Sequence, residues 1–289
     1  MTRLAWVRYG GKKAKQSARS AVVLHGMLGQ HKNLNALSSQ LANTFTDFNI
    51  YGVTHRGHGE SDRGESPFTV DSCAQDIIEL SRKEFGGVPD VIIGHSFGGK
   101  VALAVTKTCV ENNLRYPRET WILDATPGTW DDDMKKRDAV NGVSSVMSVI
   151  HDVKVPADSR ASLSEDMTQH GLPPAIVQWM TTNMERKHGK MDWSFDLQVC
   201  EKLFDSYKKT DFWPFLDSEK LGATLNCEIH FMQAGKNPNW TPDILKRFRD
   251  CPNKNVEVVE VHGAGHWIHI DKADDVFELL LPSFLRGDS

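Results

Sequence analysis

The chain has 289 residues and a mass of 32.4 kDa, which allows one large domain or two small ones at roughly 100–200 residues per domain. Its 34 Lys and Arg against 38 Asp and Glu give a net charge of -4, so no basic excess points to nucleic acid as a partner. The mean hydropathy is -0.42, and no apolar run approaches the roughly 18–20 residues that a membrane span needs.

The cysteines and the basic N-terminus bear on the compartment. The five cysteines are widely spaced and form no CxxC pair, which argues against a disulfide framework or a zinc knuckle and predicts a cytoplasmic protein with reduced thiols. Residues 1–20 carry six basic side chains and no acid, a pattern that also suits a presequence for an organelle. We favour an edge strand over 4–9, followed by a Gly-Gly turn and a solvated basic loop.

Short apolar runs alternate with helical patterns along most of the chain. This alternation predicts βαβ units and an α/β fold with a mostly parallel, doubly wound sheet. The runs are continuously apolar, so we expect helices on both faces of the sheet. Strands are expected at 21–24, 49–53, 88–94, 121–123, 229–232 and 256–261, and helices at 34–41, 73–85, 97–110, 242–248 and 275–284.

Residues 128–220 interrupt this alternation. They lack strand-like runs, are rich in Met and Trp, and contain prolines that favour several short helices. The pattern predicts a helical cap over 128–220, inserted between core segments 1–127 and 221–289. The Met and Trp side chains are candidates for the wall of an apolar pocket, or simply for the interior of the cap.

A nucleophile candidate follows the third core strand. Gly94, Ser96 and Gly98 form a G-x-S-x-G pattern between a strand and a helix, the context of a nucleophile elbow. The glycines allow the strand and the helix to approach closely around a sharp turn. The same stretch matches the start of a phosphate-binding loop through Lys100, but Val101 stands where that motif needs Ser or Thr to hold magnesium.

A base and oxyanion donors complete this chemistry. His266 lies in the loop after the last strand, where a doubly wound sheet brings it to the same edge as Ser96. Its neighbours His262 and His269 permit a metal cluster as a weaker alternative. The backbone amides of Phe97 and of Met27, in the turn after the first core strand, are the candidate oxyanion donors.

The third catalytic position has more than one candidate in the sequence. The usual place for an acid, after the penultimate strand, is occupied by Asn237. Asp124 ends the strand that follows the nucleophile helix and also reaches the carboxyl edge. Asp243 is the other candidate, although it stands in the first turn of a helix, where carboxylates commonly serve the helix dipole. We predict Asp124 and leave Asp243, another residue or no acid as alternatives.

With these residues in hand, the sequence resembles α/β-hydrolase-fold serine esterases, and more narrowly the α/β-hydrolase domain-containing protein 11 group and its bacterial relatives. That group is similar in carrying its acid after the strand that follows the nucleophile helix, which implies Ser96, Asp124 and His266 as a triad. Phe97 departs from a common Met, and Thr126 from a smaller or apolar residue. The resemblance rests on residues 25–29, 33–34, 55–61, 94–100, 123–127, 235–238 and 263–269.

The sequence thus predicts a serine hydrolase that cleaves carboxylic esters, or thioesters, of small to medium acyl chains through an acyl-enzyme. Its partner would be a small-molecule acyl ester, and no cofactor or metal is implied. The alternative is a ligand-binding receptor on the same fold that turns over very slowly or not at all. The sequence assigns no oligomeric state.

Overall fold

The computed structural model describes residues 2–10 and 19–285, with the side chains of 140 and 141 left aside. Within that part of the chain, the central sheet has seven strands in the order β1-β3-β2-β4-β5-β8-β9. Edge strand β1 (Trp6–Tyr9) pairs antiparallel with β3 (Phe48–Val53), and all other pairs are parallel. The remaining strands are β2 (Arg19–Leu24), β4 (Val91–His95), β5 (Glu119–Leu123), β8 (Glu228–Ala234) and β9 (Val256–Val261).

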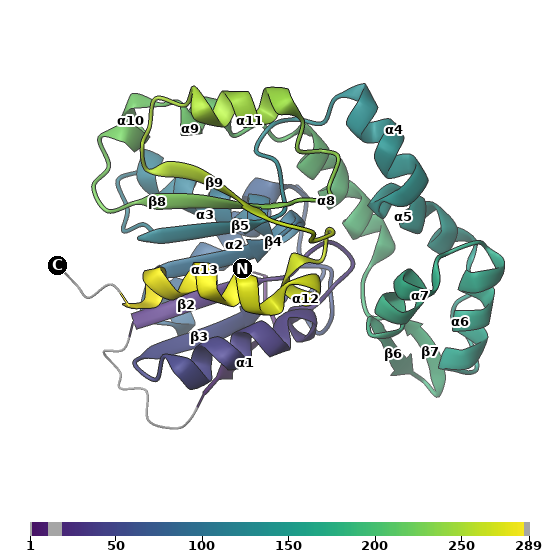
Figure 1. Ribbon diagram of the computed structural model, residues 1–289. Coiled ribbons are helices and arrows are strands. Elements are labelled where there is room, and N and C mark those ends of the chain that lie inside the picture. Colours follow the sequence, from purple (N-terminus) through teal and green to yellow (C-terminus); the bar gives the residue numbers. More distant parts are fainter. Residues whose placement is uncertain (1, 11–18, 286–289) are drawn as a thin grey trace.

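Helices cover both faces of this sheet, as the continuously apolar strands predict (Figure 1). One face packs on α1 (Asn35–Thr44) and α13 (Ala273–Leu285), and the other on α2 (Val70–Glu84), α3 (Phe97–Glu111) and α11 (Pro242–Arg249). Successive residues of β2 serve the two layers in turn, because side chains alternate along a strand. Ala21 and Val23 belong to the core under α1 and α13, whereas Val22 and Leu24 face α2 and α3.

The expected edge strand at the N-terminus is present over Trp6–Tyr9. The proposed basic loop after it falls largely on residues 11–18, which lie outside the described residues. A short 3-10 helix, η1 (His31–Leu34), precedes α1, and α12 (Ile268–Asp271) precedes α13. Two further short helices, α9 (Trp213–Leu216) and α10 (Glu219–Gly222), lead into β8.

The segment between β5 and β8 extends beyond one side of the sheet, and its residues 132–193 lie on the right of Figure 1. It contains α4 (Asp132–Asn141), α5 (Val143–Asp152), α6 (Arg160–Gln169), α7 (Pro174–Thr181) and α8 (Leu197–Lys209). We call residues 128–220 the cap segment, and the division of the chain into a core and a cap stays a prediction.

The expectation that the cap segment lacks strands is wrong. β6 (Met184–Lys187) and β7 (Lys190–Trp193) form an antiparallel hairpin. Its turn residues His188 and Gly189 have φ angles of 48° and 83°, the positive values that two-residue hairpin turns require. The short strands are largely charged, so they give little strand signal. Gly189, at the second turn position, is the feature of the sequence that indicates this hairpin.

A buried lysine joins the two connections of the cap segment. The Lys100 side chain, on α3, is 1% exposed, and its Nζ donates to the carbonyl oxygens of Gly128 at 2.8 Å, Tyr207 at 2.9 Å and Thr210 at 2.8 Å. Gly128 lies at the N-terminal end of the cap segment, and Tyr207 and Thr210 lie near its C-terminal end. Three carbonyl acceptors match the three N–H bonds of an ammonium group, so these contacts fix both connections to α3.

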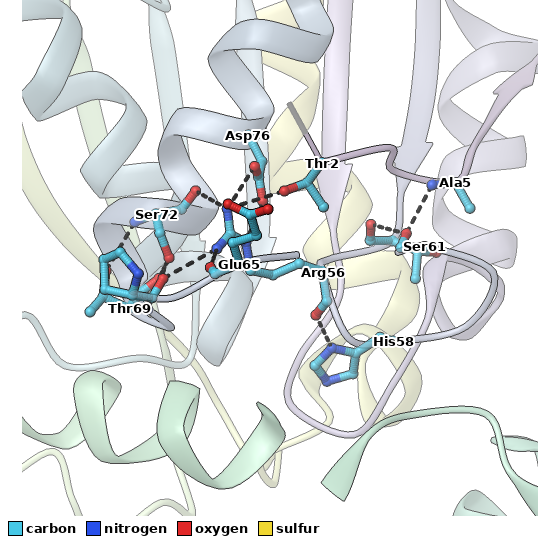
Figure 2. A network of polar contacts seen from close by, with 11 residues as sticks. Thr2, Ala5, Arg56, His58, Ser61, Glu65, Thr69, Ser72 and Asp76 are labelled. Carbon is cyan, nitrogen blue, oxygen red and sulfur yellow. Dashed lines mark hydrogen bonds and ion pairs between the residues drawn. The ribbon is translucent and has the colours of Figure 1, made fainter. Parts of the chain in front are cut away.

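A buried arginine fixes the loop after β3 (Figure 2). Arg56 forms a bidentate pair with Asp76 of α2, with Nε–Oδ2 at 2.6 Å and Nη2–Oδ1 at 2.8 Å. Its Nη1 donates to the carbonyl oxygens of Glu65 and Pro67. Because the charge is paired and its other donors are satisfied, burial is tolerated and the loop is held in one position.

Candidate active site

Ser96 stands in the tight turn between β4 and α3. Its φ of 51° and ψ of -114° are unfavourable for a residue with a side chain. A Cβ at Gly94 would lie 2.1 Å from the Gly98 carbonyl oxygen, and one at Gly98 would lie 2.6 Å from the Leu24 carbonyl oxygen. The two glycines are therefore sterically required. They let the turn form so that Ser96 stands at the carboxyl edge of the sheet.

Asp124 directly follows β5, with a φ of 55°, and its side chain is fully buried. Oδ1 accepts hydrogen bonds from the Ala234 amide at 3.0 Å and from Trp240 Nε1 at 2.7 Å. Oδ2 accepts from Asn237 Nδ2 at 2.7 Å and contacts His266 Nδ1 at 2.6 Å. Four donors thus hold one carboxylate, which compensates for its removal from water.

The contact with Asp124 fixes how the His266 ring is used. An ionised carboxylate only accepts hydrogen bonds, so we assign the ring proton to Nδ1 and leave Nε2 as a free base. The His266 side chain is 39% exposed, in contrast to its buried partner. His266 and Ser96 line the same cavity.

His95, between Gly94 and Ser96, contacts both the backbone and the ring of His266. Its Nε2 donates to the His266 carbonyl oxygen at 2.8 Å, and the two ring centroids lie 4.8 Å apart. Burial lowers the pKa of His95 well below its usual value, so this ring is neutral at physiological pH. Sequence reasoning missed His95 as a supporting residue, although it occupies a variable position of the nucleophile motif.

The turn that carries Met27 is held by a cluster of buried histidines, His25, His55 and His58. The His58 Nε2 accepts the Leu28 amide at 3.2 Å, and the His25 Nε2 accepts the His55 amide at 3.0 Å. Burial lowers the pKa of all three histidines, to about 3 for His55 and about 4 for His58. The rings are neutral, and they connect the turn after β2 to the loop after β3.

Both oxyanion candidates, Met27 and Phe97, are buried. Met27 is 3% exposed, in a turn that the Gly29 amide closes on the Gly26 carbonyl oxygen at 3.2 Å. Phe97 is the first residue of α3, and the first amides of a helix have no acceptor within the helix. Their use as oxyanion donors remains a prediction.

A cavity of about 620 Å³ opens beside Ser96 and His266. Trp130, Phe204 and Tyr207 of the cap segment supply an aromatic wall, with Phe204 and Tyr207 stacked at 5.7 Å between centroids. Burial raises the pKa of Tyr207, and a hydrogen bond with the Ser96 side chain offsets this only in part. Among the Met and Trp residues expected to wall a pocket, Trp130 lines this cavity. The other outcome, ordinary packing, applies to six methionines of the cap segment that are buried: Met134, Met147, Met167, Met180, Met184 and Met191.

The alternative assignments do not come together at this edge. Asp243 lies in the first turn of α11, behind the capping residue Thr241, and does not line the cavity. His262 is 86% exposed and bonded to Glu260, whereas His269 is buried. In residues 2–10 and 19–285, no three His, Cys, Asp or Glu side chains are grouped to hold a metal ion. Lys100, the key to the phosphate-loop alternative, donates to three backbone carbonyls instead.

The family of this chain follows from comparison with known proteins. The model of the alpha/beta hydrolase family matches residues 21–279, so the chain belongs to that family, and the predicted fold is confirmed. A solved marine microorganism esterase superposes with a TM-score of 0.77 at 19% identity, covering 98% of this chain and 99% of that one.

No helix in the described ranges has both the length and the apolar character of a membrane span.

The curated relatives narrow the resemblance. The chain is 26% identical over 264 residues to Esterase YbfF of Escherichia coli (strain K12), a match that covers 90% of each chain. It is 27% identical over 268 residues to sn-1-specific diacylglycerol lipase ABHD11 of Mus musculus, covering 91% of this chain and 80% of that one. The predicted resemblance is confirmed, and the prediction of a carboxylic ester hydrolase agrees with the names of these relatives.

Proposed function

We propose that this protein is a serine esterase that hydrolyses carboxylic esters through an acyl-enzyme, with Ser96, His266 and Asp124 as its triad. The observation that carries the proposal is the 2.6 Å contact between His266 Nδ1 and Asp124 Oδ2 at the edge of the cavity that Ser96 lines. The names of the relatives, an esterase and a diacylglycerol lipase, support the same class of reaction.

Each side chain has one role in the reaction. As Ser96 Oγ bonds to the ester carbonyl carbon, its proton passes to His266 Nε2, and Asp124 stabilises the imidazolium that forms. The carbonyl oxygen becomes an oxyanion, which the amides of Met27 and Phe97 stabilise. The carbon–oxygen bond to the alcohol then breaks and the alcohol leaves with the proton from His266. Water, activated by His266, releases the acid from Ser96 by the same steps in reverse order.

The cavity favours esters with small to medium acyl groups. Its volume of about 620 Å³ lies within the range of pockets that hold small-molecule ligands. Its aromatic wall, Trp130, Phe204 and Tyr207, provides an apolar surface for an acyl chain next to Ser96. A thioester with the same acyl group would place its carbonyl at the same position, so thioesters are a second substrate class of the same site.

The test is hydrolysis of p-nitrophenyl butyrate by the wild type and by Ser96→Ala. We expect the substitution to lower kcat by ~10⁴-fold or more, because no other group replaces the nucleophile. A fluorophosphonate probe should label Ser96 in the wild type and leave the variant unlabelled.

Two results would contradict the esterase proposal. One is hydrolysis by Ser96→Ala at the wild-type rate, which would place the nucleophile elsewhere. The other is wild-type turnover at or below about one per hour across esters and thioesters of different acyl length, which would favour the slow receptor.

A further inference from the structure

The cavity beside Ser96 contains cationic groups that the proposed reaction does not use. Arg137 of α4 lines it, together with Lys136 and with Lys236 from the loop after β8. Lys136 is paired with Asp133 at 3.3 Å. The Lys236 ammonium has no hydrogen bond or ion pair to any residue that the structure describes. The cavity therefore presents positive charge from two separate parts of the chain.

Arg137 is held in place by a chain of hydrogen bonds that ends at the proposed triad. Its Nε donates to Asn239 Oδ1 at 3.0 Å. The backbone N–H of Asn239 in turn donates to Asn237 Oδ1 at 3.0 Å. Asn237 in turn donates to Asp124 at 2.7 Å. The guanidinium position is therefore set by the same loop that orients the Asp124 carboxylate.

The far end of the Arg137 guanidinium lacks an acceptor. Its Nη2 is buried, and none of the residues in the described ranges accepts a hydrogen bond from it. Buried polar groups in native proteins are almost always paired, and an unpaired charged donor is the costliest exception. Because Arg137 lines the cavity, a ligand there can supply an acceptor to its guanidinium group.

The acidic side chains in the lining already have donors. Asp138 accepts the amides of Val143 at 2.8 Å and Ser144 at 3.0 Å, at the start of α5. Asp124 has the four donors described above. Neither carboxylate is paired with Arg137, yet both are negative charges in the same lining. A singly charged carboxylate therefore suits this cavity better than a doubly charged phosphate.

We propose that the cavity selects esters that carry a carboxylate on the acyl chain, with the Arg137 guanidinium as the principal donor and Lys236 as a weaker one. This inference rests on the proposed esterase function and names its substrate class. The guanidinium presents its N–H bonds in a plane, which suits the two oxygens of a carboxylate. The ester carbonyl would lie at Ser96 while the charged end of the acyl chain reaches α4.

The test compares two p-nitrophenyl esters of matched shape. The monoglutarate ester ends in a carboxylate, and the 5-methylhexanoate ester ends in an isopropyl group of similar size. We expect the wild type to show a higher kcat/KM for the glutarate. Arg137→Gln should lower the ratio of the two kcat/KM values by ~10–100-fold, the effect of losing a charged hydrogen bond. Lys135→Gln, on the same helix but outside the cavity lining, should keep the wild-type ratio.

The outcomes separate this inference from the function on which it rests. The relevant quantity is the kcat/KM for the glutarate divided by that for the 5-methylhexanoate. A wild-type ratio below one overturns the carboxylate proposal. An Arg137→Gln ratio equal to that of the wild type overturns it as well, even if both rates fall. Hydrolysis of the 5-methylhexanoate with no use of the glutarate also overturns it and leaves the esterase intact. Failure to cleave either ester, together with no fluorophosphonate label on Ser96, overturns the proposed function itself.

Discussion

The two walls of the cavity are built in different ways. The wall formed by the core carries Ser96, Asp124 and His266, each placed directly after a strand or in the loop that follows one, and Asp124 has a donor for every position it offers. The wall formed by the cap segment carries Trp130, Arg137 and the aromatic residues of α8, and Arg137 has a buried donor without a partner among the residues that the structure describes. In the proposals above, the core wall performs the reaction, and Arg137 of the cap wall is the principal group that selects the substrate.

The sharpest test of the core wall is the substitution Asp124→Asn. The amide cannot stabilise a charged imidazole, and it presents an N–H group to a histidine that needs an acceptor. We expect kcat to fall by ~10³–10⁴-fold for neutral and charged esters alike. Kinetics with p-nitrophenyl butyrate measure the loss, and Asp243→Asn, in the first turn of α11, is the matched control. Equal losses in the two variants would remove Asp124 from the triad.

A smaller effect is expected at Lys100, where the two walls are joined. Lys100→Met fills the same space but leaves the carbonyl oxygens of Gly128, Tyr207 and Thr210 without their donor. We expect the free energy of unfolding to fall by ~2–4 kcal/mol, since hydrogen bonds to charged groups are the stronger ones. Urea denaturation measures it, and Lys107→Met, on a partly exposed part of α3, is the control. A variant as stable as the wild type would show that these contacts do not hold the cap segment.

The smallest expected effect is on the pH dependence of the unfolding free energy, and it concerns the buried histidines His55 and His58. Burial lowers the pKa of His55 to about 3 and of His58 to about 4, below the value near 6.5 of the unfolded chain. Between about pH 6.5 and 4 the unfolded chain therefore binds protons that the folded chain does not, and the free energy of unfolding falls as the pH falls.

Removing one ring tests this assignment. His58→Gln should make the slope of unfolding free energy against pH shallower by about one proton in that range. Urea denaturation at several pH values between 4.5 and 7.5 measures the slope, and His188→Gln, exposed at the turn of the β6–β7 hairpin, should retain that of the wild type. If His58→Gln and the wild type have the same slope, His58 is not the buried neutral ring that supports the Leu28 amide.

The sequence predicted the core more fully than the cap segment, for a physical reason. In the core, continuous apolar runs mark buried parallel strands, and the glycines at 94 and 98 mark a turn whose steric demands are local. In the cap segment, the signals conflicted. Met and Trp suit both a ligand pocket and ordinary packing, and the charged β6 and β7 strands depend on their turn rather than on apolar alternation.

By itself, the sequence determined the α/β architecture, the nucleophile turn and the candidate residues at the strand ends, since these depend on local patterns and on the common edge of parallel strands. The tertiary structure alone decided which side chains meet. It brings Asp124 rather than Asp243 against His266 and joins His95 to the His266 carbonyl oxygen. It also directs Lys100 to three carbonyls and leaves Arg137 Nη2 without a partner in the described part of the chain. Such contacts join residues up to 171 positions apart, and no local pattern records them.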